Sequence, residues 1–208
     1  QRLWLFLAVV GPGIITANVD NDAGGITTYS IAGAHYGFSL LWTLVPITAA
    51  LIVVQEMSAR LGAVTGKGLS DLIREEFGVK VTFYVMTALV LTNLGNTVAE
   101  FAGVAASMEI FGVPRWLSVP LAAALVWRLV VKGTYASVEK IFLWACLFYV
   151  AYVLSGFMVG PDWSVPLAAL VTPSFSFDKG YLFMLVGLVG TTIAPWMQFY
   201  QQASVVDK

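Results

Sequence analysis

Two carboxylates separated by one residue lie inside the first apolar stretch of the chain, at Asp20 and Asp22. A carboxylate at membrane depth costs roughly 2.5–3.5 kcal/mol on insertion scales, so it needs a partner or a function. Two acids this close repel each other unless a cation lies between them or one of them is protonated. Asn21 adds an amide oxygen, and such hard oxygen ligands suit magnesium, calcium or manganese. We therefore predict a cation site here, with a salt bridge to a basic residue elsewhere in the polypeptide as the alternative.

Two further sets of polar side chains recur at helical spacing. Each set falls on one face of a helix, where it lines an aqueous path or forms hydrogen bonds between helices. The members of the first set are Asn93, Asn96, Thr97 and Glu100. The members of the second set, whose amides could hold a hydrated ion, are Gln198, Gln201 and Gln202. Both sets are candidates for an ion pathway, and interhelical bonding explains them equally well.

The elements that must position these residues are helices that cross a membrane. About 20 apolar residues span the hydrocarbon core of a bilayer, and this 208-residue chain is 59% hydrophobic and only 11% charged. We predict an all-α polytopic membrane protein whose six spans cover residues 3–33, 39–61, 79–110, 115–132, 139–160 and 180–205. A short amphipathic connector is expected at 62–78, and an outer loop rich in Pro, Ser and Asp at 161–179.

The distribution of Lys and Arg predicts a cytoplasmic N-terminus. Cytoplasmic loops carry an excess of these residues, and with the N-terminus inside only Arg115 and Lys179 of the eleven fall on outer loops. We therefore expect an integral, multi-pass protein of a prokaryotic plasma membrane, surrounded by lipid. The net charge of −1 gives no reason to expect a nucleic-acid partner. The first apolar run carries polar residues that the core of a cleavable signal peptide would not hold.

Two of the spans are interrupted near their middle. Between Asn18 and Gly25 the first span is rich in Asn, Asp and Gly, which are poor helix formers, so we expect an unwound stretch. In the sixth span Pro195 removes a hydrogen-bond donor and clashes with the preceding turn, so the helix should open there. Interrupted spans five helices apart are typical of inverted-repeat transporters, in which the broken helices meet at the substrate site. Two unrelated kinks are the simpler alternative.

Several motifs, in order along nearly the whole chain, resemble those of Nramp-type divalent metal transporters. They are Gly11-Pro12-Gly13, Tyr36-Gly37-Phe38, Ser58-Ala59-Arg60-Leu61-Gly62, Ala99-Glu100-Phe101 and Thr191-Thr192-Ile193-Ala194-Pro195. The resemblance implies a LeuT-type inverted-repeat fold with a metal site between the first and sixth helices. The chain would then hold the first repeat plus the first helix of the second, and the remaining helices of the same polypeptide would complete the transporter.

The first-helix motif departs from the family pattern. The family's Asp-Pro-Gly-Asn reads Asp20, Asn21, Asp22 and Ala23 in this sequence. The leading Asp is retained, the Asn ligand is lost at Ala23, and a second carboxylate appears at Asp22.

The sixth-helix and third-helix motifs depart as well. The family's Met-Pro-His reads Ala194, Pro195 and Trp196 here, so both the thioether and the histidine are absent. Proton-coupled members carry an Asp three residues before Glu100, where this chain has Thr97. A thioether favours transition metals, whereas magnesium keeps most of its waters and binds through a few carboxylates. These departures resemble the Nramp-related magnesium transporters, a distinct branch.

The leading interpretation is transport of a divalent metal cation, magnesium with manganese as a further substrate, without coupling to protons. The metal-site candidates are Asp20, Asn21, Asp22, Ala23 and Ala194, and Trp196 joins the two polar sets as a pathway candidate. The ion is the substrate, and no bound cofactor is expected. The alternatives are a proton-coupled manganese or iron carrier, a sodium-coupled amino-acid carrier and a structural membrane subunit. An enzyme is not expected, because no nucleophile–base pair and no metal-ligand spacing of His and Cys is present.

Overall fold

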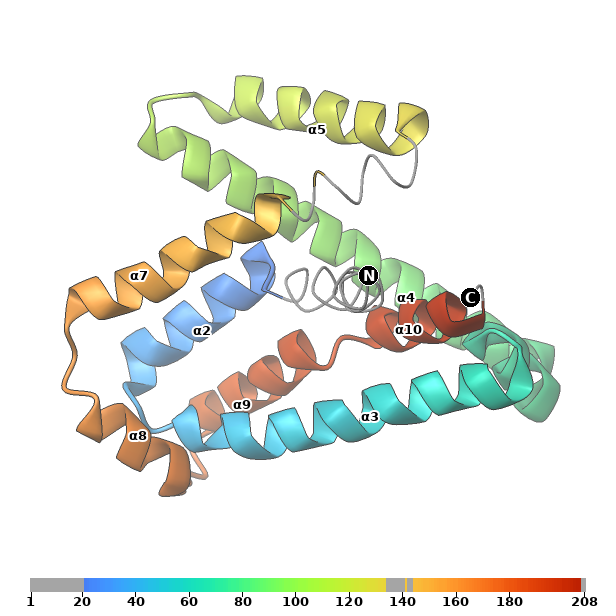
Figure 1. Ribbon diagram of the computed structural model, residues 1–208, viewed down its shortest axis with the longest axis horizontal. Helices are drawn as coiled ribbons and strands as arrows, with labels where there is room; N and C mark the ends of the chain where they lie inside the picture. Colours follow the sequence, from blue (N-terminus) through green and yellow to red (C-terminus); the bar gives the residue numbers. More distant parts are fainter. Residues whose placement is uncertain (1–20, 134–140, 142–143, 207–208) are drawn as a thin grey trace, which may run out of the picture. The chain divides into compact units, whose positions relative to one another are not determined.

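The computed structural model describes residues 21–133, 141 and 144–206 of the chain, and its regular secondary structure there is helical throughout. Figure 1 shows the order of the elements along the chain. They are α2 (Ala23–Tyr36), η1 (Leu41–Thr43), α3 (Leu44–Thr65), α4 (Leu69–Ile110), α5 (Arg115–Lys132), η2 (Cys146–Tyr149), α7 (Val150–Val159), α8 (Ser164–Val171), α9 (Lys179–Thr192) and α10 (Pro195–Val206).

The helices form two compact units. The first unit combines the described residues up to Ile26 with those of Ala99–Trp163, and the second combines Thr27–Val98 with the residues from Ser164 onward. Helices α2 and α4 therefore each contribute to both units. The two interrupted spans fall into different units, since the start of α2 belongs to the first and the segment from α9 to α10 to the second.

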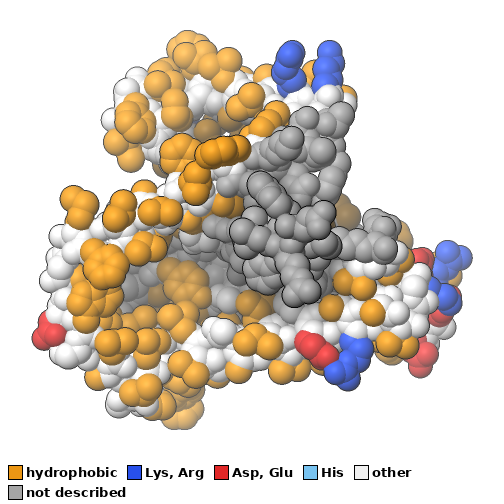
Figure 2. Space-filling model, viewed as in Figure 1, with side chains coloured by type: hydrophobic (Ala, Val, Ile, Leu, Met, Phe, Trp, Pro, Cys, Tyr) orange, Lys and Arg blue, Asp and Glu red, His pale blue; other side chains and the backbone are white. Residues whose placement is uncertain are grey.

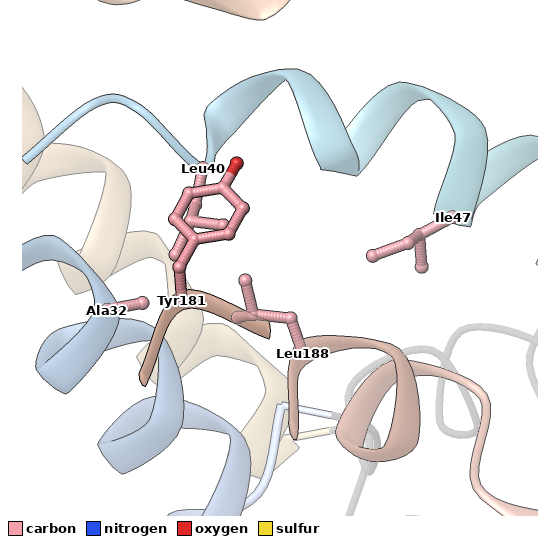
Figure 3. Close-up of a cluster of buried hydrophobic side chains, with 5 residues drawn as sticks. All are labelled: Ala32, Leu40, Ile47, Tyr181 and Leu188. Carbon is pink, nitrogen blue, oxygen red and sulfur yellow. The ribbon is translucent and has the colours of Figure 1, made fainter. Parts of the chain in front are cut away.

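The core of the second unit lies where α2, α3 and α9 come together. It consists of Ala32, Leu40, Ile47, Tyr181 and Leu188, each at most 5% exposed. Figure 3 shows the five side chains, which come from α2, the turn before η1, α3 and α9. This core fixes the first half of the sixth span, α9, against the start of α3.

A polar cluster in the same unit holds the segment before α9. The backbone carbonyl of Ser174 accepts hydrogen bonds from Trp42 Nε1 at 2.9 Å and from the Tyr181 hydroxyl at 2.5 Å. The Ser174 hydroxyl in turn donates to the carbonyl of Ser39 at 2.7 Å. Asp178 then caps α9 by accepting from the backbone N–H groups of Gly180 and Tyr181.

The connector before the third expected span is continuous with α4 in the structure. Helix α4 runs over Leu69–Ile110, but Gly78 interrupts it with φ 79° and ψ 171°. This left-handed backbone favours glycine because a Cβ would be strained there. The break divides α4 into a short first piece and a long piece from residue 79 to residue 110.

The outer loop expected at 161–179 is not entirely loop, because α8 occupies Ser164–Val171. The expectation rested on the Pro and Ser content of this segment. Pro166 falls in the first turn of α8, where a missing N–H costs no intrahelical hydrogen bond, and the following Leu and Ala residues favour a helix.

Three helical segments of the described part are long and apolar enough to cross a membrane, namely Leu41–Thr65, Leu69–Ile110 and Lys179–Val206. A fourth is added if Cys146–Val159 and Ser164–Val171, bent by 113°, form one span. Helix α5 has the bounds expected for the fourth span but carries Arg115, Arg128 and Lys132 and is not among them. Figure 2 shows apolar side chains over much of the visible face, with charged ones in a few small groups. The six expected spans remain a prediction, since parts of 3–33 and 139–160 lie outside the described residues.

Candidate functional site

Asp22 forms the start of α2. Its Oδ1 accepts a hydrogen bond from the backbone N–H of Gly25 at 2.6 Å, and its carbonyl accepts from Ile26 N–H at 2.9 Å. This is the arrangement of an N-cap, in which a side-chain oxygen satisfies an N–H group that the first turn leaves unpaired. The unwound stretch expected as far as Gly25 therefore ends at Asp22, because the cap allows the helix to begin at Ala23.

Glu100 brings a second carboxylate to the same helix start. Its Oε1 accepts a hydrogen bond from the backbone N–H of Ala23 at 3.1 Å, across 77 residues of sequence. Asp22 and Glu100 thus cap two N–H groups of one helix terminus, whose dipole favours negative charge. A carboxylate has about four acceptor positions, so the caps leave both acids with oxygens that can bind a cation.

The close approach of α4 to α2 depends on a glycine. A Cβ added to Gly103 would lie 2.5 Å from the Cβ of Ala23, closer than such atoms come in real structures. Gly103 stands three residues after Glu100, on the same helical face. The small side chain therefore allows Glu100 to reach the start of α2.

Tyr149 contacts the residue before the cap. Its hydroxyl donates to the carbonyl oxygen of Asn21 at 3.1 Å. Backbone oxygens outside a helix are hard ligands, and Tyr149 occupies the one at Asn21. The first unit thus places Asn21, Asp22, Ala23 and Glu100 together, whereas Asp20 lies outside the described residues.

The rest of the first polar set lies further along α4. Asn93 and Asn96 are half-buried, while Thr97 is exposed. The Thr97 hydroxyl donates to the carbonyl of Asn93 at 2.8 Å, a bond within its own helix. Glu100 is therefore the member of this set that the structure brings to the start of α2.

The sixth span is interrupted between α9 and α10. Ile193 has non-helical dihedral angles of φ −112° and ψ 66°, and α10 begins at Pro195. Ala194 is half-buried in this break. In the orientation that satisfies its hydrogen bonds, the amide nitrogen of Gln198 donates to the carbonyls of Ala194 at 2.8 Å and Pro195 at 2.7 Å.

The other predicted residues of this region lie on α10. Trp196 is half-buried and packs edge-on against Tyr200, with ring centroids 6.4 Å apart. Gln201 is half-buried, whereas Gln202 is fully buried and bonded to the backbone of the α3–α4 connection. At the end of α9, the hydroxyl groups of Thr192 and Tyr29 lie 2.7 Å apart.

Sequence reasoning did not single out Gly103 or Tyr149. Gly103 continues the helical face of Glu100, so a small residue there was an available sign of close helix packing. A tyrosine inside an apolar span must find a partner for its hydroxyl, but the sequence could not show that the partner is Asn21. Among the residues that the structure describes, no group of three or more His, Cys, Asp or Glu side chains could hold a metal ion.

Comparison with known proteins gives one consistent result. The profile of a family described as Nramp, natural resistance-associated macrophage protein-like, matches residues 13–208. The divalent metal cation transporter MntH of Deinococcus radiodurans is 28% identical over 201 residues, covering 95% of this chain and 46% of that protein. MntH of Bacillus subtilis is 32% identical over 196 residues, covering 91% and 45%. Metal transporter Nramp3 of Arabidopsis thaliana is 31% identical over 216 residues, covering 100% and 41%. The chain spans about half the length of the curated relatives it matches.

Proposed function

Because the chain belongs to the Nramp family, whose members are polytopic transporters of the LeuT-type fold, we propose that the protein carries divalent metal cations across a membrane. The observation that carries the proposal is the start of α2. There the carboxylates of Asp22 and Glu100 meet at one helix terminus inside an apolar chain. Acids inside membrane spans are costly and mark ion pathways.

The proposed ion ligands are the sequence-based candidates from each of the two interrupted spans. Asp20, Asn21, Asp22 and Ala23 come from the first, and Ala194 comes from the second. The two acids supply charge, and the break at Ala194 supplies backbone carbonyl oxygen. Glu100 neighbours the site through its bond to Ala23 N–H, and the half-buried Asn93 and Asn96 on the same helix are proposed to line the pathway with Thr97.

Magnesium is the proposed substrate, with manganese as a second one. Ala194 and Trp196 stand where the family motif has a soft thioether and a histidine, and removing sulfur removes a preference for transition metals. A site with two carboxylates and space for water suits an ion that keeps part of its hydration shell. The proposed orientation has a cytoplasmic N-terminus in a prokaryotic plasma membrane, because nine of the eleven Lys and Arg residues then face inward.

A proton-coupled manganese or iron carrier is the second candidate. Family membership leaves this candidate open, since relatives such as MntH are named divalent metal cation transporters without a particular ion. Against coupling, Thr97 cannot titrate, and the one histidine of the chain, His35, lies in the last turn of α2, away from the helix start. We therefore propose transport without protons.

The test is uptake into proteoliposomes that contain the full-length protein and a pH-sensitive dye. Gradients of Mg²⁺ and Mn²⁺ should drive metal entry without acidifying the lumen, and Asp20→Ala should abolish entry while the protein stays folded. Protein-dependent acidification that requires the metal would support the proton-coupled carrier instead. Absence of divalent metal uptake by the wild-type protein would refute the proposed function.

A further inference from the structure

We propose that Gln202 is a positioning residue, which fixes α10 on α3 and thereby sets the position of the backbone at the Ile193–Ala194 break. The inference rests on the proposed function, because it concerns the half-helix that follows the proposed ion site. It differs from the sequence-based expectation for Gln202, which placed its amide on an aqueous path. The observations that support it all lie within the second unit.

The Gln202 side chain is completely buried and reaches another part of the chain. Its exposure is 0%, and its Nε2 donates to the carbonyl oxygen of Lys67 at 2.8 Å, across 135 residues. Lys67 follows Gly66, which ends α3 with left-handed dihedral angles of φ 63° and ψ 20°. The carbonyl of Lys67 therefore lies beyond the helix end and is available to a side chain. The bond ties the inner part of α10 to the end of α3.

The backbones of the two helices also approach closely beside this bond. A Cβ added to Gly62 would lie 3.0 Å from the carbonyl oxygen of Gln202 and 3.3 Å from the Cβ of Val205. A side chain at position 62 would therefore require α10 to shift by a few tenths of an ångström. The Gln202–Lys67 hydrogen bond and the close contact at Gly62 both involve the same turn of α10.

A second polar contact holds α10 nearer the break. Gln55 Nε2 donates to the sulfur of Met197 at 3.6 Å, and Met197 is only 2% exposed. The contacts at Gln55 and Gly62 are two turns apart on α3, so they fix the direction of α10 as well as its distance from α3. Because Met197 is only three residues from Ala194, its contact with Gln55 also restricts the backbone at the break.

The chemistry of Gln202 argues that its role is geometric rather than stabilising. Among the described residues, no group is hydrogen-bonded to the buried Oε1 atoms of Gln202 and Gln55. The contribution of the Gln202 amide to the described fold is therefore the directional bond from its N–H group to the carbonyl of Lys67. We therefore infer that the N–H group of the amide orients α10 relative to the end of α3.

Helix α3 spans the break, because it contacts both halves of the sixth span. Its outer part packs against α9 through the core of Ile47, Tyr181 and Leu188. Its C-terminal part contacts α10 at Gly62, and Lys67, just beyond the helix end, accepts the hydrogen bond from Gln202. Ile193 has no helical continuity to transmit direction from α9 to α10. The position of α10 relative to α9 is consequently set by α3. The Gln202 side chain supplies the hydrogen bond that holds α10 to the end of α3.

The test combines a distance with transport kinetics in the full-length protein. Spin labels at Val64 on α3 and Tyr200 on α10, both exposed, are introduced after Cys146→Ser. The wild-type protein should give one narrow distance distribution, with or without Mg²⁺. Gln202→Leu should broaden it and raise the KM for Mg²⁺ uptake about fivefold, in protein that still unfolds cooperatively.

A second variant and a control complete the test. Gly62→Ala should also broaden the distance distribution and raise the KM, because the added Cβ pushes α10 away from α3. Ala203→Leu, at an exposed neighbouring position, should change neither the distance nor the KM. An unchanged distance distribution in Gln202→Leu would overturn the inference, and so would a broadened distribution with an unchanged KM. If the wild-type protein carries no divalent metal, the proposed function fails, whereas the distances still decide whether Gln202 fixes α10.

Discussion

In the two interrupted spans, the backbone at the break bonds to side chains of opposite kinds, acceptors in the first span and donors in the sixth. At the start of α2, the carboxylates of Asp22 and Glu100 accept hydrogen bonds from backbone N–H groups. At the start of α10, the Gln198 amide donates to backbone carbonyls, and Gln202 ties the same helix to α3. The first break is therefore negatively charged and the second is neutral. The difference is consistent with the proposal that the first break supplies charge to a cation, while the second break supplies neutral groups.

Substitution of Asp22 is the strongest way to break this comparison, because Asp22 both carries charge and caps α2. Asn caps a helix about as well as Asp, whereas Ala does not. If the charge binds the ion, Asp22→Asn should reduce Mg²⁺ uptake roughly a hundredfold, equivalent to about 2.8 kcal/mol, with an unchanged thermal unfolding midpoint. Asp22→Ala should lose the same uptake and also about 1 kcal/mol of stability.

The opposite result would show that the charge of Asp22 is not needed for ion binding. Uptake at the wild-type level in Asp22→Asn, together with a destabilised Asp22→Ala, would make Asp22 a cap and nothing more. The two breaks would then differ in hydrogen-bond direction alone. Both variants are compared in the same liposome assay, at matched protein incorporation.

Gly103→Ala tests whether the first break needs the close approach of α4. The added Cβ would meet the Cβ of Ala23 at 2.5 Å, and overpacking of this kind destabilises by about 1–3 kcal/mol. We expect a lower thermal unfolding midpoint and weaker uptake, because Glu100 would move away from Ala23 N–H. Gly95→Ala on the same helix is the control, since a Cβ there meets nothing within 4 Å, and it should be neutral or slightly stabilising. Equal behaviour of the two variants would contradict the tight α2–α4 contact.

Ala194→Met sharpens the comparison from the side of the second break. It restores a soft ligand, so the preference should shift toward Mn²⁺ or Cd²⁺ and away from Mg²⁺. We expect a change in the ratio of uptake rates of about fivefold, equivalent to about 1 kcal/mol. Competition of each ion against Mg²⁺ uptake measures the ratio. Unchanged selectivity would show that the side chain at position 194 does not face the ion.

The general architecture was predictable because it follows from local sequence. Apolar runs predicted an all-α membrane protein, and motif order predicted the LeuT-type fold; both predictions are confirmed by the helices and the family match. The α8 helix was missed because Pro and Ser suggested a loop, although Pro166 is harmless in a first turn. The extent of unwinding after Asp22 was overestimated, because the propensities of Asn, Asp and Gly do not reveal a cap.

The sequence by itself determined which residues carry charge, where the backbone of the sixth span must open, and which soft ligand is absent. These properties depend on residue type and on spacing along one helix, so no distant contact changes them. Only the tertiary structure decided that Glu100 reaches the N–H of Ala23 across 77 residues and that Gln202 reaches Lys67 across 135. Such contacts depend on the rotation and separation of packed helices, which helical periodicity leaves free. Glycines at positions 62 and 103 allow these close separations. The sequence could not show this, because a missing Cβ matters only where another helix packs against it.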